Sequence, residues 1–153
     1  MPHVLIEYSA NLGSQLDFPQ FLRALRDSAL ATGVFPVGGI RVRAYQADHY
    51  LIADGAADNA FVHIMLRVGH GRDLQTRQRA CAAIFATACE QLETLYNRIP
   101  LGISLEMQEI SPEVSYRKNN LHEYVKRREA AGTTAARAEP SAREVQDDKG
   151  PAQ

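Results

Sequence analysis

The chain has 153 residues, a formal net charge of −1 at pH 7 and 45% hydrophobic residues. These values indicate one globular domain that is long enough to bury a core, with room for a short appendage. The near-neutral charge gives no electrostatic signature of a nucleic-acid or anionic-membrane partner. No apolar run reaches the roughly 18–20 residues of a membrane span, and the N-terminus lacks the segments of a signal peptide.

The first predicted element is an apolar-leaning strand over residues 1–8, in which Pro2 directly follows the initiator methionine. A helix follows the loop after this strand. Asp17 is placed to accept a hydrogen bond at its N-terminus, Pro19 suits its first turn, and Gly33 is placed to end it. Apolar residues recur at helical spacing between these signals.

Residues 40–45 predict a second strand because their side chains alternate strictly. One face carries Ile40, Val42 and Ala44, and the other carries Arg41, Arg43 and Tyr45. A third strand over residues 60–68 alternates in the same way. A helix capped by Asp73 follows and ends before Pro100, and residues 101–108 form a fourth strand.

This order of elements predicts an α/β fold in which two βαβ units form one four-stranded mixed sheet. Right-handed crossovers place both helices on the same face of the sheet. The other face carries Leu5, Phe61 and Met65 among polar residues. Apolar side chains on an uncovered sheet face favour contact with another subunit, so we expect an oligomer.

The domain is predicted to span residues 1–128. Its last part, residues 111–128, offers three apolar positions for docking: Leu121, Tyr124 and Val125. Residues 129–153 contain too few apolar side chains to offset the entropy of ordering, so we expect a disordered tail.

The two cysteines, Cys81 and Cys89, fall in one predicted helix. With a rise of 1.5 Å per residue their Cα atoms would lie about 12 Å apart, which is beyond the reach of a disulfide. Free thiols are typical of a reducing compartment, so we expect a cytoplasmic protein. Neither the cysteines nor the five histidines show the spacing of metal ligands.

Pro2 is the first candidate functional residue. A small second residue usually allows removal of Met1, which would leave Pro2 with a free secondary amine. An α-amine has a reference pKa of about 7.7–8.0, which burial or a neighbouring cation lowers. A base tuned near the working pH suits general acid–base catalysis. Proline also begins strands for purely structural reasons, so the dipeptide alone leaves both interpretations open.

Four stretches of the sequence carry a resemblance to one known family. They are the N-terminal Met-Pro strand, TGVFPVGGIRVR at 32–43, ADG…AFVHIMLRVGHGR at 53–72 and KNNLH at 118–122. Together, over residues 2–127, the chain closely resembles the 5-carboxymethyl-2-hydroxymuconate isomerases of the tautomerase superfamily.

The resemblance implies a homotrimer of βαβ-repeat subunits that acts without a metal or organic cofactor. It implies isomerisation of 5-carboxymethyl-2-hydroxymuconate, a dienol, to its 2-oxo-ene form. This step belongs to the bacterial catabolism of homoprotocatechuate, which is formed from 4-hydroxyphenylacetate. The family's N-terminal proline is the acid and base and corresponds to Pro2. Two family arginines correspond to Arg41 and Arg72.

These residue types suit a dicarboxylate or tricarboxylate substrate. A planar guanidinium binds a carboxylate through two hydrogen bonds and stabilises the charge of a dienolate in a water-poor site. Arg41 and Arg72 are therefore predicted to bind carboxylates, and Arg43, on the same side of its strand as Arg41, is a second candidate. Solvation, or pairing with surface carboxylates, is the alternative interpretation of all three.

Asn119, Asn120 and His122 match the family's C-terminal motif. We expect them to cap a helix and contact another subunit rather than to line the site.

Two other functions stay open on the sequence alone. One keeps Pro2 but changes the reaction to that of a tautomerase, decarboxylase or dehalogenase acting on another unsaturated acid. The other is a non-catalytic oligomeric binding module. Retention of Met1 would favour the latter, because an acylated Pro2 nitrogen has no basic lone pair.

Overall fold

The computed structural model describes residues 1–132. Its strands are β1 (His3–Ser9), β2 (Arg41–Ala47), β3 (Ala60–Gly69) and β4 (Leu101–Ile110). Its helices are α1 (Phe18–Ala31), α2 (Leu74–Tyr96) and α3 (Leu121–Ala130), with short 3₁₀ helices η1 (Ala10–Leu12) and η2 (Val37–Gly39). The predicted tail over 129–153 falls outside the described residues from position 133 onward.

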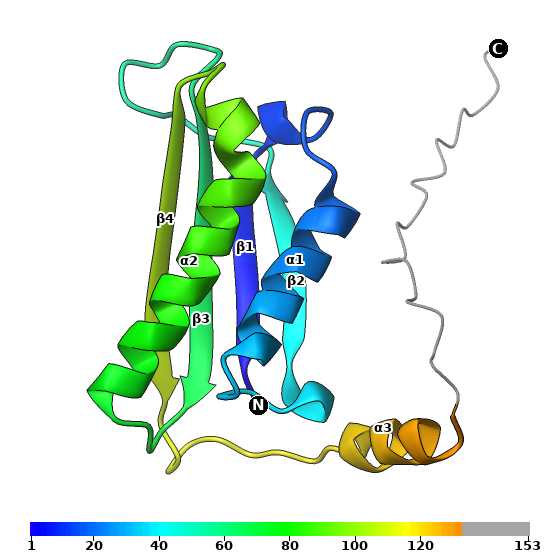
Figure 1. The fold of residues 1–153 in the computed structure, drawn as a ribbon. Coiled ribbons are helices and arrows are strands. Elements are labelled where there is room, and N and C mark those ends of the chain that lie inside the picture. Colours follow the sequence, from blue (N-terminus) through cyan, green and yellow to red (C-terminus); the bar gives the residue numbers. More distant parts are fainter. Residues whose placement is uncertain (133–153) are drawn as a thin grey trace, which may run out of the picture.

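The four strands form one mixed sheet in the order β2-β1-β3-β4. The two outer pairs, β1 with β2 and β3 with β4, are parallel, whereas β1 and β3 run antiparallel. Helices α1 and α2 lie side by side across one face of this sheet (Figure 1). The predicted arrangement of two βαβ units with both helices on one face is confirmed.

The core lies between this helix layer and the sheet. On β3, alternate side chains from Ala60 to Val68 are buried, as the predicted period of two requires. Helix α1 buries Phe21, Leu25 and Ala29, and α2 buries Ala80, Ile84, Ala88, Leu92 and Leu95. Each large aliphatic or aromatic side chain so buried contributes about 1.5–3 kcal/mol through the hydrophobic effect.

Both long helices begin at the predicted capping residues. The Asp17 carboxylate accepts a hydrogen bond from the Gln20 N–H at 3.0 Å, and the Asp73 carboxylate accepts one from the Thr76 N–H at 2.7 Å. Gly33 follows α1 with a φ of 71°, a conformation that favours glycine. These local interactions fix where each crossover leaves and rejoins the sheet.

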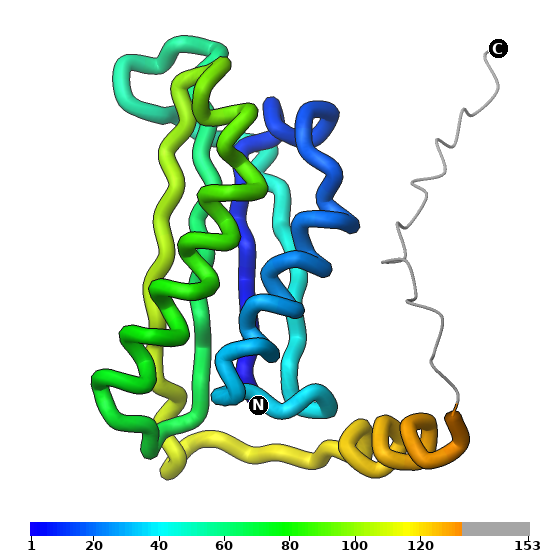
Figure 2. The backbone as a smooth tube through the Cα atoms, in the orientation of Figure 1, coloured from blue at the N-terminus to red at the C-terminus, as the bar shows by residue number. Residues whose placement is uncertain are grey.

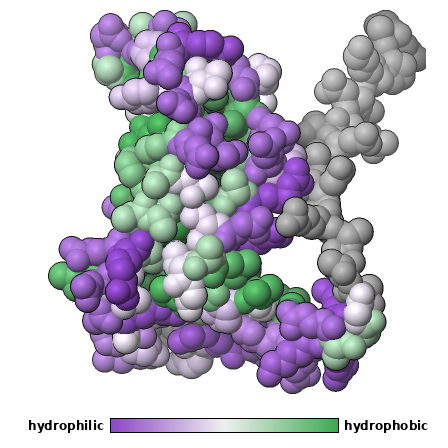
Figure 3. Space-filling view, viewed as in Figure 1, coloured by the Kyte–Doolittle hydropathy of each residue, from purple (hydrophilic) through white to green (hydrophobic). Residues whose placement is uncertain are grey.

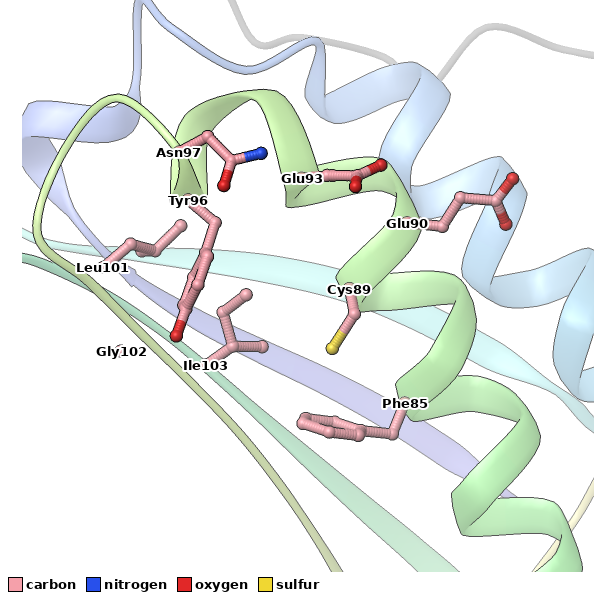
Figure 4. Close-up of a pocket in the computed structure, with 9 residues that line it drawn as sticks. All are labelled: Phe85, Cys89, Glu90, Glu93, Tyr96, Asn97, Leu101, Gly102 and Ile103. Carbon is pink, nitrogen blue, oxygen red and sulfur yellow. The ribbon is translucent and has the colours of Figure 1, made fainter.

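Helix α2 buries less of its surface than its apolar pattern predicts. Leu74 is 61% exposed and Phe85 is 37% exposed. Phe85 faces the edge of the sheet, where it lines a groove of about 790 Å³ between α2 and β4 together with Cys89 and Ile103 (Figure 4). Hydrophobic residues gather in the middle of this side of the molecule, with hydrophilic residues at both ends (Figure 3).

The segment after β4 crosses one end of the sheet and leads into α3, which lies beyond β2 near the N-terminus (Figure 2). Docking through Leu121, Tyr124 and Val125 was predicted; Val125 is half-buried, whereas Leu121 and Tyr124 are 44% and 46% exposed. The helix instead approaches η2 through backbone and polar groups, because Gly38 has no side chain to hold it away. It continues to Ala130, two residues beyond the predicted end of the domain.

Among residues 1–132, no element covers the sheet face opposite helices α1 and α2. Leu5, Met65 and Tyr45 line a cavity of about 220 Å³ there, together with polar side chains of the same strands. Half-buried Phe61 lies on the same face. An apolar surface of this kind is what the predicted subunit contact requires.

Candidate active site

Pro2 lies at the centre of one end of the sheet, because it precedes β1 and β1 is an inner strand. The residue is buried, and its carbonyl accepts a hydrogen bond from the Arg41 N–H at 3.1 Å. The parallel register continues this contact by pairing His3 with Arg41. Pro2 and the first residue of β2 are therefore held together by the sheet itself.

The buried pair Gly38 and Gly39 lets other elements approach Pro2 closely. A Cβ placed on Gly39 would lie 3.5 Å from Pro2 Cδ and 3.6 Å from His122 Cε1. The ring of Pro2 and the imidazole of His122 thus face the same glycine. Helix α3 consequently forms one side of the N-terminal site.

Arg41 is held in place from both sides of the site. One guanidinium nitrogen donates to the Gly39 carbonyl at 2.6 Å, and another donates to Asn119 Oδ1 at 3.4 Å. The Asn119 amide in turn donates to the Gly38 carbonyl at 3.0 Å. Asn119 therefore links the C-terminal segment to both η2 and the predicted carboxylate-binding residue.

Arg72 extends from the loop after β3 and is anchored to backbone groups. Its guanidinium donates to the Gly69 carbonyl at 2.9 Å and to the Val34 carbonyl at 3.2 Å. It also lies over the ring of Phe35, with its central carbon 5.5 Å from the ring centroid. Gly71 makes the preceding turn with a φ of 109°. These contacts leave the guanidinium half-buried and oriented.

The α-amine in the structure belongs to Met1, directly before Pro2. Burial lowers the pKa of this amine, and the positive charges of Arg117, Arg41 and Arg72, in that order of size, lower it further. All of these effects favour the neutral amine, because burial and neighbouring cations both destabilise an ammonium group. The fold thus brings three arginines to the N-terminus and creates an environment suited to a base.

Comparison with known proteins identifies the family. Residues 2–125 match the sequence model of the family described as 5-carboxymethyl-2-hydroxymuconate isomerase. A relative from Escherichia coli, 5-carboxymethyl-2-hydroxymuconate Delta-isomerase, is 35% identical over 122 residues, which are 80% of this chain and 97% of the relative. The chain belongs to the 5-carboxymethyl-2-hydroxymuconate isomerase family.

Solved structures agree with this assignment. A crystal structure of a 5-carboxymethyl-2-hydroxymuconate delta-isomerase is similar with a TM-score of 0.77 and 34% identity, covering 82% of this chain and 93% of that chain. The crystal structure of a 5-carboxymethyl-2-hydroxymuconate isomerase from Deinococcus radiodurans R1 is similar with a TM-score of 0.76 and 35% identity, covering 81% of this chain and 93% of that chain. The crystal structure of Pt0534 inactivated by 2-oxo-3-pentynoate has a TM-score of 0.56 and 17% identity, and the match covers 80% of this chain and 98% of that chain. It shares the fold, which is that of the tautomerase superfamily.

Within this isomerase fold, Arg43 is directed toward His3 and Tyr45. It donates to His3 Nδ1 at 3.1 Å and to the Tyr45 hydroxyl at 2.6 Å. The cations that lower the pKa of the N-terminal amine are Arg117, Arg41 and Arg72. Burial first, and then the charge of Arg43, lowers the pKa of His3, so the neutral imidazole can accept this hydrogen bond.

The structure brings three residues to the site that sequence reasoning had not placed there: Arg117, Asn119 and His122. Of the residues predicted to cap a helix, Asn119 accepts a hydrogen bond from the Leu121 N–H at 3.1 Å through its Oδ1. The N-cap residue of α3 is Asn120, and its side chain makes no capping hydrogen bond. The contact of Asn119 with Arg41 was not foreseen. The available signal for Arg117 was its position directly before the KNNLH motif of the isomerase family.

The remaining features of the described residues concern metal binding, a second cavity, the cysteines and membrane helices. Residues 1–132 contain no group of three or more His, Cys, Asp or Glu side chains that could hold a metal ion. The groove beside Phe85 lies toward the end of the molecule opposite the N-terminus (Figures 1 and 4). In the same range, Cys81 and Cys89 are both free thiols, as predicted. None of the described helices is long and apolar enough to cross a membrane.

Proposed function

We propose that this protein isomerises 5-carboxymethyl-2-hydroxymuconate from its dienol to its 2-oxo-ene form in the catabolism of homoprotocatechuate. Family membership and the name of the Escherichia coli relative support this substrate. One structural observation carries the proposal. Pro2 is buried directly after the N-terminus, where burial and then the charges of three arginines lower the pKa of the Met1 amine.

In the proposed mechanism, removal of Met1 exposes the secondary amine of Pro2. The neutral amine accepts the proton of the 2-hydroxyl group, so the O–H bond breaks and a dienolate forms. The double bonds then shift to give C2=O and C3=C4, and the Pro2 ammonium returns the proton to C5. One residue thus acts first as base and then as acid, which requires a pKa near the working pH.

Arg41 and Arg72 are proposed to bind substrate carboxylates and to stabilise the dienolate. Their guanidinium groups are already oriented by backbone carbonyls, so little side-chain entropy is lost on binding. Their positive charges also keep Pro2 neutral, because a nearby cation disfavours the ammonium form. The reaction moves a proton within one substrate molecule and transfers no electrons. The Pro2 amine and the two guanidinium groups therefore supply all the chemistry that the proposed mechanism requires.

We further propose that the protein acts as a cytoplasmic homotrimer. The uncovered sheet face with Leu5, Phe61 and Met65 supports a subunit interface, and the free thiols suit a reducing compartment. Sedimentation equilibrium would measure the mass of the assembly directly. A monomer at micromolar concentration would contradict the trimer.

An ultraviolet assay tests the activity. It follows the loss of conjugated dienol absorbance when purified protein, shown by intact mass to lack Met1, is added to 5-carboxymethyl-2-hydroxymuconate. We expect saturable acceleration over the uncatalysed ketonisation. No acceleration, combined with turnover of another unsaturated acid in a panel, would assign the protein to a different reaction of the superfamily.

A further inference from the structure

Arg117 lies in the segment between β4 and α3, which crosses the same end of the sheet as the N-terminus (Figure 2). Its guanidinium nitrogen is 3.8 Å from the position that a Cβ on Gly69 would occupy. It also borders a cavity of about 80 Å³ at the N-terminus. The other residues lining this cavity are Met1, His3, Gly69, Ile110, Ser115 and Tyr116.

The hydrogen-bond donors of Arg117 are available to a ligand. Among residues 1–132, its guanidinium forms no hydrogen bond, ion pair or contact with an aromatic ring, whereas Arg41 and Arg72 both donate to backbone carbonyls. No acidic residue lines the cavity beside it. Without an acidic partner there, the charge of this exposed guanidinium is free to attract an anion.

The sheet order places Arg117 and Arg41 on opposite sides of the N-terminus. Arg41 begins β2, whereas Arg117 lies beside the ends of β3 and β4, and β1 runs between them. Strands two positions apart are separated by about 10 Å. This separation suits an extended six-carbon diacid that spans the N-terminal amine, with a guanidinium at each end.

We propose that Arg117 binds a substrate carboxylate on the β3–β4 side of Pro2 and gives the enzyme its preference for a tricarboxylate over a dicarboxylate. This inference rests on the proposed function. A muconate has two carboxylates, and the 5-carboxymethyl group adds a third. Arg41, Arg72 and Arg117 then provide one guanidinium for each carboxylate.

The test compares two substrates that differ only in the third carboxylate, 5-carboxymethyl-2-hydroxymuconate and 2-hydroxymuconate. For Arg117→Gln, the ratio of kcat/KM on the tricarboxylate to kcat/KM on the dicarboxylate should fall by about tenfold or more, as expected for loss of a charge-assisted hydrogen bond. A change in the pKa of Pro2 affects both substrates and cancels in this ratio. Arg117→Lys should restore part of the preference.

Lys118→Gln is the matched control. It removes one positive charge from the neighbouring exposed position and keeps the Arg117 guanidinium. Its ratio should equal that of the wild-type protein. An unchanged ratio in Arg117→Gln, or an equal loss on both substrates, would overturn the inference while leaving the proposed function intact. Wild-type protein without activity on the tricarboxylate would overturn both.

Discussion

Gly38 lies directly against the start of α3, and Gly38→Ala tests whether that contact positions the site. A Cβ at this position would lie 2.7 Å from His122 Nδ1, 2.8 Å from His122 Cα and 2.9 Å from its backbone nitrogen. Two of these atoms belong to the backbone, so no change of side-chain rotamer relieves the clash. The start of α3 has to move by about 0.5 Å or more to restore ordinary van der Waals contact.

This movement disturbs the hydrogen bonds of the site more than the stability of the core. Helix α3 has no buried residue, so displacing it leaves the core between sheet and helices unchanged. The displacement strains the hydrogen bond from Asn119 to the Gly38 carbonyl and the contact between Asn119 and Arg41. One such hydrogen bond contributes about 1 kcal/mol, which corresponds to an increase of about fivefold in KM.

Steady-state kinetics measures the rise in KM, and hydrogen exchange of residues 119–130 measures the displacement of α3. Gly102→Ala is the matched control because its Cβ would meet only the Ala60 carbonyl, at 3.9 Å. Both substitutions reduce the entropy of the unfolded chain equally, so their difference reports the clash. Asn119→Ala should raise KM similarly, and combining it with Gly38→Ala should add little. Wild-type KM and unchanged exchange in Gly38→Ala would refute this account of the contact.

Four further outcomes are expected. Pro2→Ala should keep the fold and lower kcat by at least about tenfold, because its primary amine differs in basicity and geometry; wild-type turnover would remove Pro2 from the mechanism. Arg72→Ala should raise KM or lower kcat/KM by about 10- to 100-fold, and unchanged kinetics would place the carboxylate contact elsewhere. Arg43→Gln should alter kcat/KM less than Arg41→Gln, since Arg43 contacts His3; an equal loss would place it in the site. The melting temperature should fall as the pH drops below about 6.5, because the fold lowers the pKa of His3 and the unfolded chain therefore binds protons more readily; a His3→Gln variant with the same slope would exclude this cause.

The elements of the fold were predictable because their signals are local. Asp17 and Asp73 accept hydrogen bonds only three residues away, and the alternation along β3 reflects one buried face. Helical spacing identified α2, but it could not show that Phe85 faces a sheet edge rather than the core. That distinction depends on which strands lie beneath the helix, a property of the whole sheet.

The candidate site was predictable only in part, because its contacts join residues that are far apart in the sequence. Pro2, Arg41 and Arg72 came from the family resemblance, and the sheet order shows how Pro2 and Arg41 meet. The contact between Asn119 and the Gly38 carbonyl joins positions 81 residues apart, so no local pattern encodes it. Arg117 is an exposed basic residue in a polar segment, and it gains significance only because that segment crosses the N-terminal end of the sheet.

The most direct test of the central claim is a pH titration of the Pro2 amine in protein labelled with ¹⁵N-proline, observed by NMR beside the pH profile of kcat/KM. Intact mass first verifies that Met1 is absent. The account predicts that the amine titrates at a lower pH in the folded protein than in the unfolded chain, and that this pKa coincides with the rising limb of kcat/KM. An amine that titrates as in the unfolded chain, or a kinetic limb at a different pH, would contradict the assignment of Pro2 as the catalytic base.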